Sequence, residues 1–344
     1  MRGRPAGVGR ERVDGFRHEA LMYAGSDDIL EQASRFIEDG IDAGEPTFVV
    51  IDAPMIGRLG ARFGPQALLT FADMTVLGAN PSRIIPAWQT FVDDHGEGSP
   101  LRGIGQPVWA ARTEQELVEC ERHESLLNLA FSGSANMWLM CPYDVESLDD
   151  ATIRGAERTH PSIAGHLRRS RSEAFEGVGA AGAPFDTPLP EAFPSAPAMS
   201  FDAETLSSVR PWLAGHATAL GLSCDRVDDL VLAVSEISVN SVRHGGGRGV
   251  VRIWPGDDAV VCEVADAGSV TDPLAGRKRP TTDQEDGFGL WLANQLCDLV
   301  QIRTFVDGSV VRLHLRLIDA QLAAGSAAPE GSTRLVGSPP ASER

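Results

Sequence analysis

One segment near the middle of the chain constrains the fold more than any other feature. Residues 171–200 read RSEAFEGVGAAGAPFDTPLPEAFPSAPAMS, which is rich in Gly, Ala and Pro and has neither a helical nor an alternating apolar pattern. The chain of 344 residues is long enough for a hydrophobic core on each side of it. We therefore predict two domains, residues 14–170 and 201–318, joined by a linker at 171–200. Residues 319–344 lack the apolar side chains that a core needs and are expected to form a disordered tail.

The composition excludes several classes of partner. The chain has 48 acidic against 30 basic residues, a net charge of -18, whereas a nucleic-acid backbone is bound by clustered cations. No stretch approaches the ~20 apolar residues of a membrane-spanning helix, and the Arg-rich start leads into polar residues rather than a signal-type apolar segment. We expect a cytoplasmic protein that binds neither nucleic acid nor membrane.

Two residue types limit the chemistry that the chain can carry. The only lysine is Lys278. Because a phosphate-binding P-loop needs a lysine that reaches the β- and γ-phosphates, residues 1–277 cannot form one. The cysteines lie far apart without a CxxC pair, which predicts reduced, mostly buried thiols rather than a zinc or redox motif. They are Cys120, Cys141, Cys224, Cys262 and Cys297.

Segments typical of strands and helices alternate in the first half. HEALMYA and PTFVVID read as strands, and the residues between them repeat apolar side chains at helical spacing, with Asp27 or Asp28 as N-cap and Gly44 as the end. A helix with an Asn80 cap and Pro81 in its first turn follows, then the strand LRGIGQPVW, the helix TEQELVECERHESLLNLAF and the strand ANMWLMCPYD. This alternation predicts an α/β sandwich with a mostly parallel sheet.

Polar side chains stand where these strands end or helices begin. Parallel sheets bind ligands at the carboxyl ends of their strands, so such residues can form a site. They can equally belong to solvated helix faces and turns, and the pattern leaves both interpretations open. The residues are Arg102, Gln106, Glu119, Arg122, His123, Glu124, Tyr143 and Asp144.

Four motifs in the first half occur in a recognisable order. HEALMYAGSDDIL, RGIGQPVW, ECERHESLLN and LMCPYD together resemble the MEDS sensory domain over most of residues 16–168. The resemblance implies a fold related to RecA-like ATPases whose phosphate loop has been lost. It also implies that the domain senses a small ligand or signal, which the sequence does not identify.

A long helix in the second half carries a row of polar side chains. Ser223 or Asp225 can cap a helix that runs to about His244, with an apolar stripe at i, i+3, i+4, i+7 spacing. Glu236 and Asn240 project from the opposite side, one turn apart. By itself the pair fits a solvated helix face as well as a functional site.

The segments after this helix provide groups that suit a nucleotide. The hairpin GVVRIWPGDDAVVCEVAD ends in Asp266, which can accept a hydrogen bond from the amine of adenine, and Gly268 lets the backbone approach the base. Residues 269–286 have no strand pattern and are long enough for a lid. Gly287 and Gly289 then open a helix whose N–H groups can face phosphates. The hairpin LVQIRTFVDGSVVRLHLRL closes the domain.

The ordered motifs EISVN, DAG and GFGL resemble the GHKL ATPases, which include gyrase, Hsp90 and histidine kinases, and most closely the anti-sigma-factor serine kinases. The likeness covers about residues 202–318 and implies the α/β sandwich of the Bergerat fold with ATP and Mg²⁺ as cofactors. It implies Glu236 as catalytic base, Asn240 as magnesium ligand and Asp266 as the adenine-reading acid, roles that suit these side chains. The glycines that match the family's phosphate-loop and lid positions are Gly268, Gly287 and Gly289.

Some positions depart from this pattern or stay ambiguous. Val270 replaces the second glycine of D-x-G-x-G and does not readily adopt a positive φ, so the lid hinge should differ, which puts turnover in question more than binding. Arg277 or Lys278 can meet the γ-phosphate, or the two can form a solvated basic cluster. His244 matches a family position but is expected only to end its helix.

Three functions follow from these features. An anti-sigma kinase would bind ATP, sequester a sigma factor and phosphorylate a serine of a STAS-type antagonist under control of the sensory domain, as Glu236 favours. A catalytically silent module would bind ATP and a partner only, as Val270 permits. A histidine kinase is disfavoured because no two-helix phosphoacceptor hairpin is visible, and neither His160 nor His166 is followed by an acidic residue.

The resemblance also implies a homodimer. Trp212 or Trp291 can lie on an apolar pairing surface, or either can belong to the core.

Overall fold

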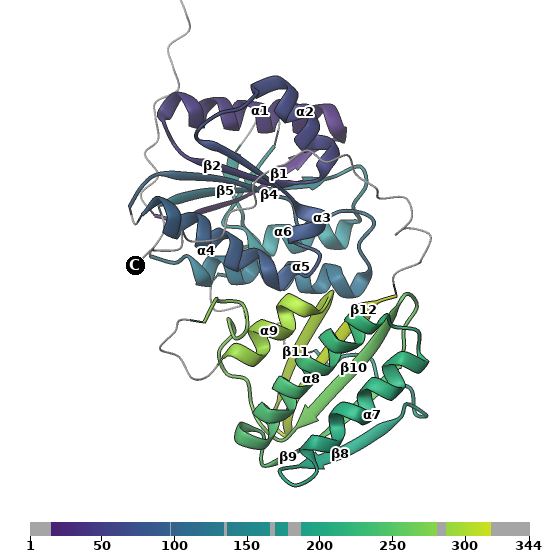
Figure 1. Cartoon of the computed structure of the whole chain (residues 1–344). Helices are drawn as coiled ribbons and strands as arrows, with labels where there is room; N and C mark the ends of the chain where they lie inside the picture. The colour runs from purple at the N-terminus through teal and green to yellow at the C-terminus, as the bar shows by residue number, and fades with distance from the viewer. Residues whose placement is uncertain are drawn as a thin grey trace, which may run out of the picture.

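The computed structural model of the chain describes residues 15–96, 98–133, 136–165, 169–177, 187–280 and 287–317. They form two units, each built on its own sheet, that lie against one another (Figure 1). The mixed α/β class predicted from the sequence is confirmed. The predicted tail, His166 and the last part of the predicted lid lie outside the described residues. None of the described helices is long and apolar enough to cross a membrane.

The first unit contains a seven-stranded sheet. Its strands are β1 (Arg17–Tyr23), β2 (Thr47–Ile51), β3 (Leu69–Asp73), β4 (Leu101–Gly105), β5 (Met137–Asp144), β6 (Ser162–Ala164) and β7 (Arg169–Arg171). They lie in the order β3-β2-β4-β5-β1-β6-β7. All neighbours pair in parallel except β6 and β7, which confirms the mostly parallel sheet.

Helices cover both faces of this sheet. They are α1 (Gly25–Ala43), α2 (Ala53–Phe63), α3 (Met74–Leu77), the short 3-10 helix η1 (Pro81–Arg83), α4 (Ile84–His95), α5 (Glu114–Ala130) and α6 (Asp150–Thr159). α1 and α2 lie on one face and α4, α5 and α6 on the other (Figure 1). Ile37 and Leu59 belong to the core under α1 and α2, whereas Trp88 and Leu126 belong to the opposite core. The unit is therefore a three-layered sandwich.

Local sequence signals set several helix ends. Gly44 ends α1 in the left-handed conformation, with a φ of 71°, as predicted. The side chain of Asn80 caps η1, which leads directly into α4. Thr113 and Glu116 form a reciprocal capping box at the start of α5.

Two local predictions for the first half are wrong. Neither Asp27 nor Asp28 is the N-cap of α1, because the chain turns out of β1 at once and the helix begins at Gly25. Asp28 instead accepts a hydrogen bond from the backbone N–H of Ala24. The strand predicted over LRGIGQPVW ends at Gly105, since a proline follows that cannot donate to a strand ladder.

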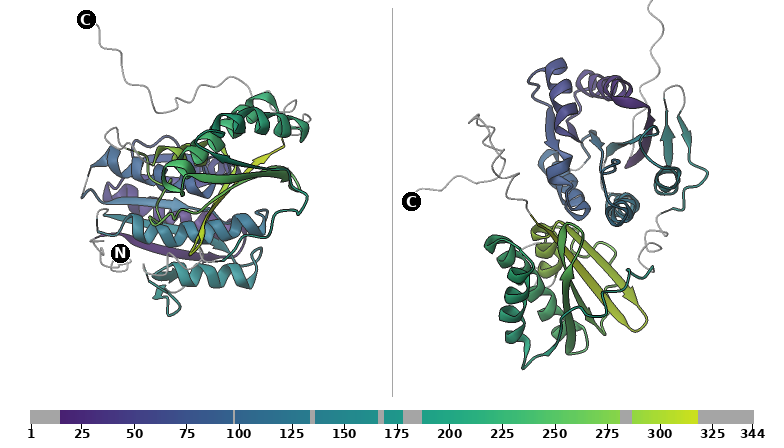
Figure 2. Two further views of the ribbon diagram at one scale, coloured as in Figure 1. Left: turned by 90° about the horizontal axis from the view of Figure 1, so that it is seen from below. Right: turned by 90° about the vertical axis from the view of Figure 1, so that its right-hand side faces the viewer.

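The second unit contains a five-stranded sheet with helices on one face (Figure 2). Its elements are β8 (Ala198–Asp202), α7 (Leu206–Ala219), α8 (Cys224–His244), β9 (Arg248–Pro255), β10 (Ala259–Asp266), α9 (Phe288–Leu296), β11 (Leu299–Phe305) and β12 (Gly308–Arg316). The strand order is β11-β12-β10-β9-β8, and all pairs are antiparallel. Both predicted hairpins, β9 with β10 and β11 with β12, are present.

The segment predicted as a linker is partly used by both sheets. β7 includes Arg171, and β8 begins at Ala198, where it pairs with β9. Between them, the carbonyl of Thr187 accepts a hydrogen bond from Arg303, and that of Pro190 accepts one from Arg312. This described part of the segment thus lies along the second sheet.

Candidate nucleotide site

Helix α8 supports the residues that the sequence predicts as a site. Its apolar stripe is buried against the sheet and leaves Glu236 and Asn240 half-buried on the side next to α9. Gly289 is where α9 meets this pair: a Cβ there would lie 2.8 Å from Nδ2 of Asn240 and 3.2 Å from Cβ of Glu236. The missing side chain of Gly289 therefore lets three predicted residues meet.

Asp266 ends β10 beside the same helix. Its Oδ2 accepts a hydrogen bond from the hydroxyl of Ser241 at 2.5 Å. Its Oδ1 accepts from the hydroxyl of Ser309 at 3.0 Å and from the N–H of Gly268 at 2.8 Å. Three donors thus fix the orientation of the carboxylate and still leave lone-pair capacity for another donor. Ser241 also belongs to α8, so the carboxylate is bound to the same helix as Glu236 and Asn240.

The segment after β10 runs against the end of α8. A Cβ on Gly268 would lie 2.8 Å from Cα of Gly245 and 2.9 Å from the carbonyl oxygen of His244. His244 is the exposed last residue of α8, as expected for a helix end. The close backbone contact at Gly268 is therefore a steric requirement for glycine.

The start of α9 has the form expected of a phosphate-facing helix end. Gly287 is its N-cap, with a left-handed φ of 99°, and no side chain caps the helix. The first N–H groups of such a helix have no intrahelical acceptor. A Cβ on Gly287 would have nothing within 4 Å, so this glycine is explained by its backbone conformation rather than by packing.

The lid begins differently from the family pattern. Val270 does not adopt a positive φ; among the described residues only glycines do. Its N–H donates to Oγ1 of Thr304 on β11 at 3.2 Å, and its side chain packs against the core of the second unit. Val270, which replaces the glycine of the family pattern, is thus bound to the sheet.

A buried ion cluster joins the lid to the first unit. The carboxylate of Glu119 on α5 lies 3.4 Å from Arg277 of the lid, 2.9 Å from Arg303 on β11 and 3.4 Å from Arg122 on α5. All four side chains are at most 5% exposed. The expectation of a solvated cluster is wrong for Arg277, because the arginine is buried against α5. Contact of Arg277 or Lys278 with a γ-phosphate stays a prediction. Lys278 is exposed.

This cluster has more positive than negative charge. One carboxylate faces three guanidinium groups, and burial lowers the pKa of Arg277 and Arg122 from the usual arginine range. Leu274, three residues before Arg277, is 5% exposed and belongs to the apolar core of the first unit. The described lid, residues 269–280, is therefore held by an apolar contact as well as by charge.

The first unit also contacts the end of α9. Nδ2 of Asn80 donates to the carbonyl oxygens of Asn294 and Cys297 at 3.1 and 3.2 Å. The guanidinium of Arg83 donates to the same two oxygens at 2.8 and 2.9 Å. A cation suits the carbonyl end of a helix. The lid and the helix that follows it are thus both bound by the first unit.

The polar residues singled out in the first half are mostly not solvated. The interpretation as solvated faces is wrong for the residues of α5, because this helix packs between the first sheet and the second unit (Figure 1). It is also wrong for the strand residues Arg102 and Tyr143, which are buried. Gln106 donates to the hydroxyl of Tyr23 at 2.7 Å, and Asp144 is half-buried. The buried members are Arg102, Glu119, Arg122, His123, Glu124 and Tyr143.

Two cavities of about 300 Å³ lie elsewhere. One is in the first unit, between α1 and the β1 and β5 strands, and the other is between α7 and α8. Neither is lined by a predicted nucleotide residue. The first is lined by Glu19, Leu21, Gln32, Arg35, Phe36, Asp39, Trp138, Met140, Ala164, Gly165 and Arg169.

Other predicted residues have plain structural positions. His160 follows α6 and is fully buried, so its ring is not accessible as a phosphoacceptor. Trp212 is half-buried and packs against the second core, which favours the core alternative. Trp291 stacks obliquely with Phe288. The homodimer stays a prediction.

Sequence reasoning missed residues that act through contacts between distant segments. Ser241 lies on α8 directly after Asn240, and this position was the available signal for its contact with Asp266. Ser309 follows a tight turn and gave no signal. Glu119 and Arg303 lie in different units, so no local pattern could pair them.

Two family models match the chain. The model described as MEDS, the MEthanogen/methylotroph, DcmR Sensory domain, matches residues 17–161. The model described as histidine kinase-like ATPase domain matches residues 199–315. Each match covers one of the two units and includes the motifs that carried the corresponding resemblance.

The second unit is similar to curated kinases. Serine-protein kinase RsbW of Bacillus licheniformis is 33% identical over 121 residues, which cover 31% of this chain and 74% of the kinase. Serine-protein kinase RsbW of Bacillus subtilis (strain 168) is 32% identical over 114 residues, which cover 29% and 71%. A structure of the RsbU and RsbW domains of Rv1364c from Mycobacterium tuberculosis matches with a TM-score of 0.26 and 23% identity over 35% of this chain and 32% of that one, too low a score to compare arrangements. The chain belongs to the RsbW family of histidine kinase-like ATPases and carries a MEDS domain ahead of the ATPase domain.

Proposed function

We propose that the second unit binds ATP with Mg²⁺ and that the chain is a cytoplasmic anti-sigma-factor regulator. In this proposal it sequesters a sigma factor, phosphorylates a serine of a STAS-type antagonist and is controlled by its MEDS domain. The observation that carries the proposal is the contact of Gly289 with Glu236 and Asn240 beside the fixed carboxylate of Asp266. The similarity to serine-protein kinases supports the reaction type.

The residues at this contact fit a magnesium nucleotide. Gly268 and Gly289 lie so close to α8 and its C-terminal end that a Cβ would clash there, so they hold the segment after β10 and the start of α9 against that helix. Asp266 would accept from the adenine amine, and Asn240 would offer an amide oxygen to Mg²⁺. The N–H groups that follow Gly287 suit phosphate oxygens.

Glu236 is the group suited to proton transfer. ATP, when bound, supplies the phosphoryl group. Glu236 would accept the proton of the attacking serine hydroxyl, and it lies one turn before Asn240, the proposed metal ligand. Its half-buried position beside α9 restricts water without closing the side chain off.

Contacts between the units support control by the MEDS domain. Glu119 pairs with Arg277, so the first unit holds the lid in one position, and Asn80 and Arg83 hold the far end of α9. A signal that changes the packing of α5 would change how firmly the lid is held. In this proposal the conformational equilibrium of the lid is therefore coupled to that of the MEDS domain.

The nucleotide site is tested by calorimetric titration of the full chain with ATP in Mg²⁺. Asn240→Ala should weaken binding at least about tenfold, because it removes the magnesium ligand. The matched control is Arg243→Ala, which changes an exposed residue on the same helix and should bind as the wild type does. Equal affinities for the Asn240 variant and the wild type would overturn the nucleotide site.

The same experiment separates a kinase from a silent module. Glu236→Gln should keep ATP affinity but lower phosphate transfer to a STAS-type antagonist by roughly 10²–10⁴. Transfer is measured with labelled ATP. A wild type that binds ATP but labels none of the candidate antagonists would leave the non-catalytic regulator as the function.

A further inference from the structure

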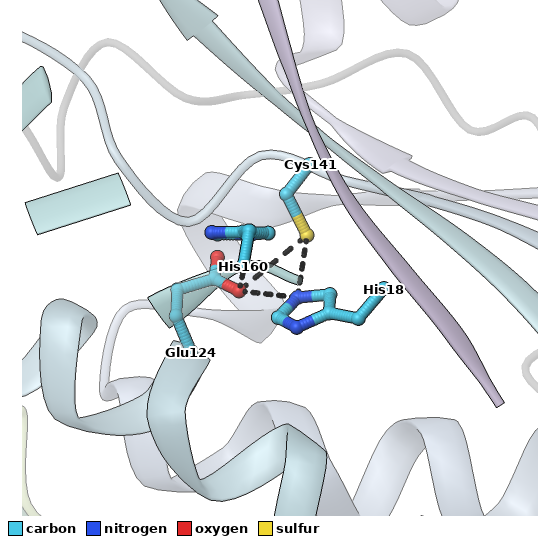
Figure 3. Close-up of side chains that lie close together, drawn as sticks. All are labelled: His18, Glu124, Cys141 and His160. Carbon is cyan, nitrogen blue, oxygen red and sulfur yellow. Dashed lines mark hydrogen bonds and ion pairs between the residues drawn. The ribbon is translucent and has the colours of Figure 1, made fainter. Parts of the chain in front are cut away.

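Four side chains with metal-binding atoms converge inside the first unit (Figure 3). His18 comes from β1, Glu124 from α5 and Cys141 from β5, and His160 directly follows α6. All are at most 1% exposed, and one ligand atom from each lies within 4.8 Å of the others. The cluster is remote from the proposed nucleotide residues, which all belong to the second unit.

Hydrogen bonds fix which nitrogen of each ring carries the proton. Nδ1 of His160 lies 2.8 Å from the carbonyl oxygen of Ala156, which can only accept, so Nδ1 is the donor. Nδ1 of His18 lies 3.1 Å from Oδ1 of Asn128. The amide nitrogen of Asn128 donates to the carbonyl of Thr159 at 2.8 Å, which fixes the orientation of that amide. In the neutral rings both Nε2 atoms therefore present lone pairs.

These lone pairs point at another acceptor. Oε2 of Glu124 lies 3.0 Å from Nε2 of His18 and 3.4 Å from Nε2 of His160. The Sγ of Cys141 lies 3.4 Å from Nε2 of His18, and the thiol donates to the same carboxylate oxygen at 3.4 Å. Nε2 of His160 and Oε1 of Glu124 are buried and have no hydrogen-bond partner. Buried acceptors without a donor are unfavourable unless a cation lies among them.

The charges in the cluster favour a cation. The side chains of His18, Glu124 and His160 are fully buried, so water cannot compensate a charge there. A buried carboxylate next to neutral rings lacks a compensating positive charge.

We propose that His18, Glu124, Cys141 and His160 bind one divalent transition-metal ion of the Zn²⁺ class. Two imidazole nitrogens, one sulfur and one carboxylate oxygen are a ligand set of the kind that four-coordinate Zn²⁺ accepts. The ion replaces the proton of the Cys141 thiol, so that one metal–sulfur bond forms and one proton is released. Thiolate and carboxylate then balance the two positive charges of the ion.

The surroundings of the cluster match those of a metal site. Metal-binding histidines usually donate their other ring N–H to an oxygen, which fixes the ring. His18 does so to Asn128, and His160 does so to the carbonyl of Ala156. The four ligands come from four separate parts of the chain, so no short spacing such as CxxC announces the site in the sequence.

The test is metal binding by the purified full chain after dialysis against a chelator. Titration with Co²⁺ should give one equivalent per chain, with the visible bands of tetrahedral cobalt and a thiolate-to-cobalt charge-transfer band. Zn²⁺ should displace the cobalt and raise the melting temperature by mass action. A chain that binds no Co²⁺, or binds it without the charge-transfer band, overturns the proposal.

Variants locate the site. Cys141→Ser should remove the charge-transfer band, and His160→Gln should lower the affinity for Co²⁺ at least about tenfold. The matched control is Cys224→Ser, which changes an exposed cysteine in the other unit and should bind cobalt as the wild type does. Loss of the band in the control, or its survival in Cys141→Ser, contradicts the assignment. Circular dichroism checks folding, and if Cys141→Ser does not fold, the His160→Gln affinity and the wild-type spectrum decide.

Discussion

At the scale of single residues, two serine hydroxyls and one backbone N–H orient the carboxylate of Asp266. An unpaired carboxylate at this depth would be hydrated and mobile, so the hydroxyls of Ser241 and Ser309 give it one direction. A ligand that donates a hydrogen bond to Asp266 therefore meets a carboxylate that already became ordered when the chain folded. This preorganisation lowers the entropic cost of binding.

A half-buried histidine gives the second unit a pH dependence that can be measured. Burial lowers the pKa of His314 from 6.5 to about 4. Its contribution to the free energy of unfolding is complete above pH 6.5 and is lost as the pH falls from 6.5 towards 4, because the unfolded chain takes up the proton first. His314→Gln should reduce the slope of unfolding free energy against pH in that window, by up to about 1.4 kcal/mol per pH unit.

Denaturant unfolding at several pH values measures this slope. The control is His216→Gln, which makes the same substitution at a half-buried histidine on α7. A His314 variant with the wild-type slope would show that this ring does not titrate differently in the folded chain.

At the scale of elements, the crossing of α8 and α9 is set by one glycine. Gly289→Ala would place a Cβ 2.8 Å from Nδ2 of Asn240, so the helices must move apart. We expect the free energy of unfolding to fall by about 1–3 kcal/mol. The affinity for ATP should fall by more than this loss of stability accounts for. Gly215→Ala on α7 is the matched control, because its Cβ would have nothing within 4 Å, and it should be neutral or stabilising. Equal melting temperatures for the two variants would contradict the close crossing.

Long periodic elements were predictable from the sequence, whereas short ones were not. α1 and α8 repeat apolar residues over many turns, and each hairpin has turn residues between two strand patterns. α2, β3, α6 and the β6 and β7 pair were not predicted. They are short, and β7 and α6 are largely polar, so their formation depends on the sheet that they join rather than on their own pattern.

The candidate site shows the same division. The residues that share α8 or open α9 follow from helical periodicity, and the resemblance assigned their roles. The contact of Asp266 with Ser309 on β12 depends on strand register, which could not be derived from the sequence. The burial of Arg277 was not predicted, because the residues that bury it belong to the other unit and the local sequence around Arg277 does not indicate them.

At the scale of the whole molecule, Glu119 is the only acid that contacts Arg277 and Arg303 among the described ion pairs. Glu119→Gln would leave buried arginines without their counter-charge, which costs several kcal/mol. We expect the units to separate more often, so that hydrogen exchange in residues 269–280 speeds up and ATP affinity changes.

Hydrogen exchange of the full chain, with and without ATP, measures this effect. Glu121→Gln is the matched control, because Glu121 lies on the same helix and pairs with Arg158 within the first unit at a partly exposed position. Exchange should change only in the Glu119 variant. Equal protection of the lid in both variants would mean that the charge cluster does not hold the lid.

The position of Glu119 and Glu124 on one helix has a consequence for how a signal would travel. With a rise of about 1.5 Å per residue, the two carboxylates leave α5 roughly 7.5 Å apart along its axis. One points into the four-ligand cluster and the other to the arginines of the second unit. A small rotation or shift of α5 moves both carboxylates together. A signal can therefore cross the domain boundary without a series of loop movements.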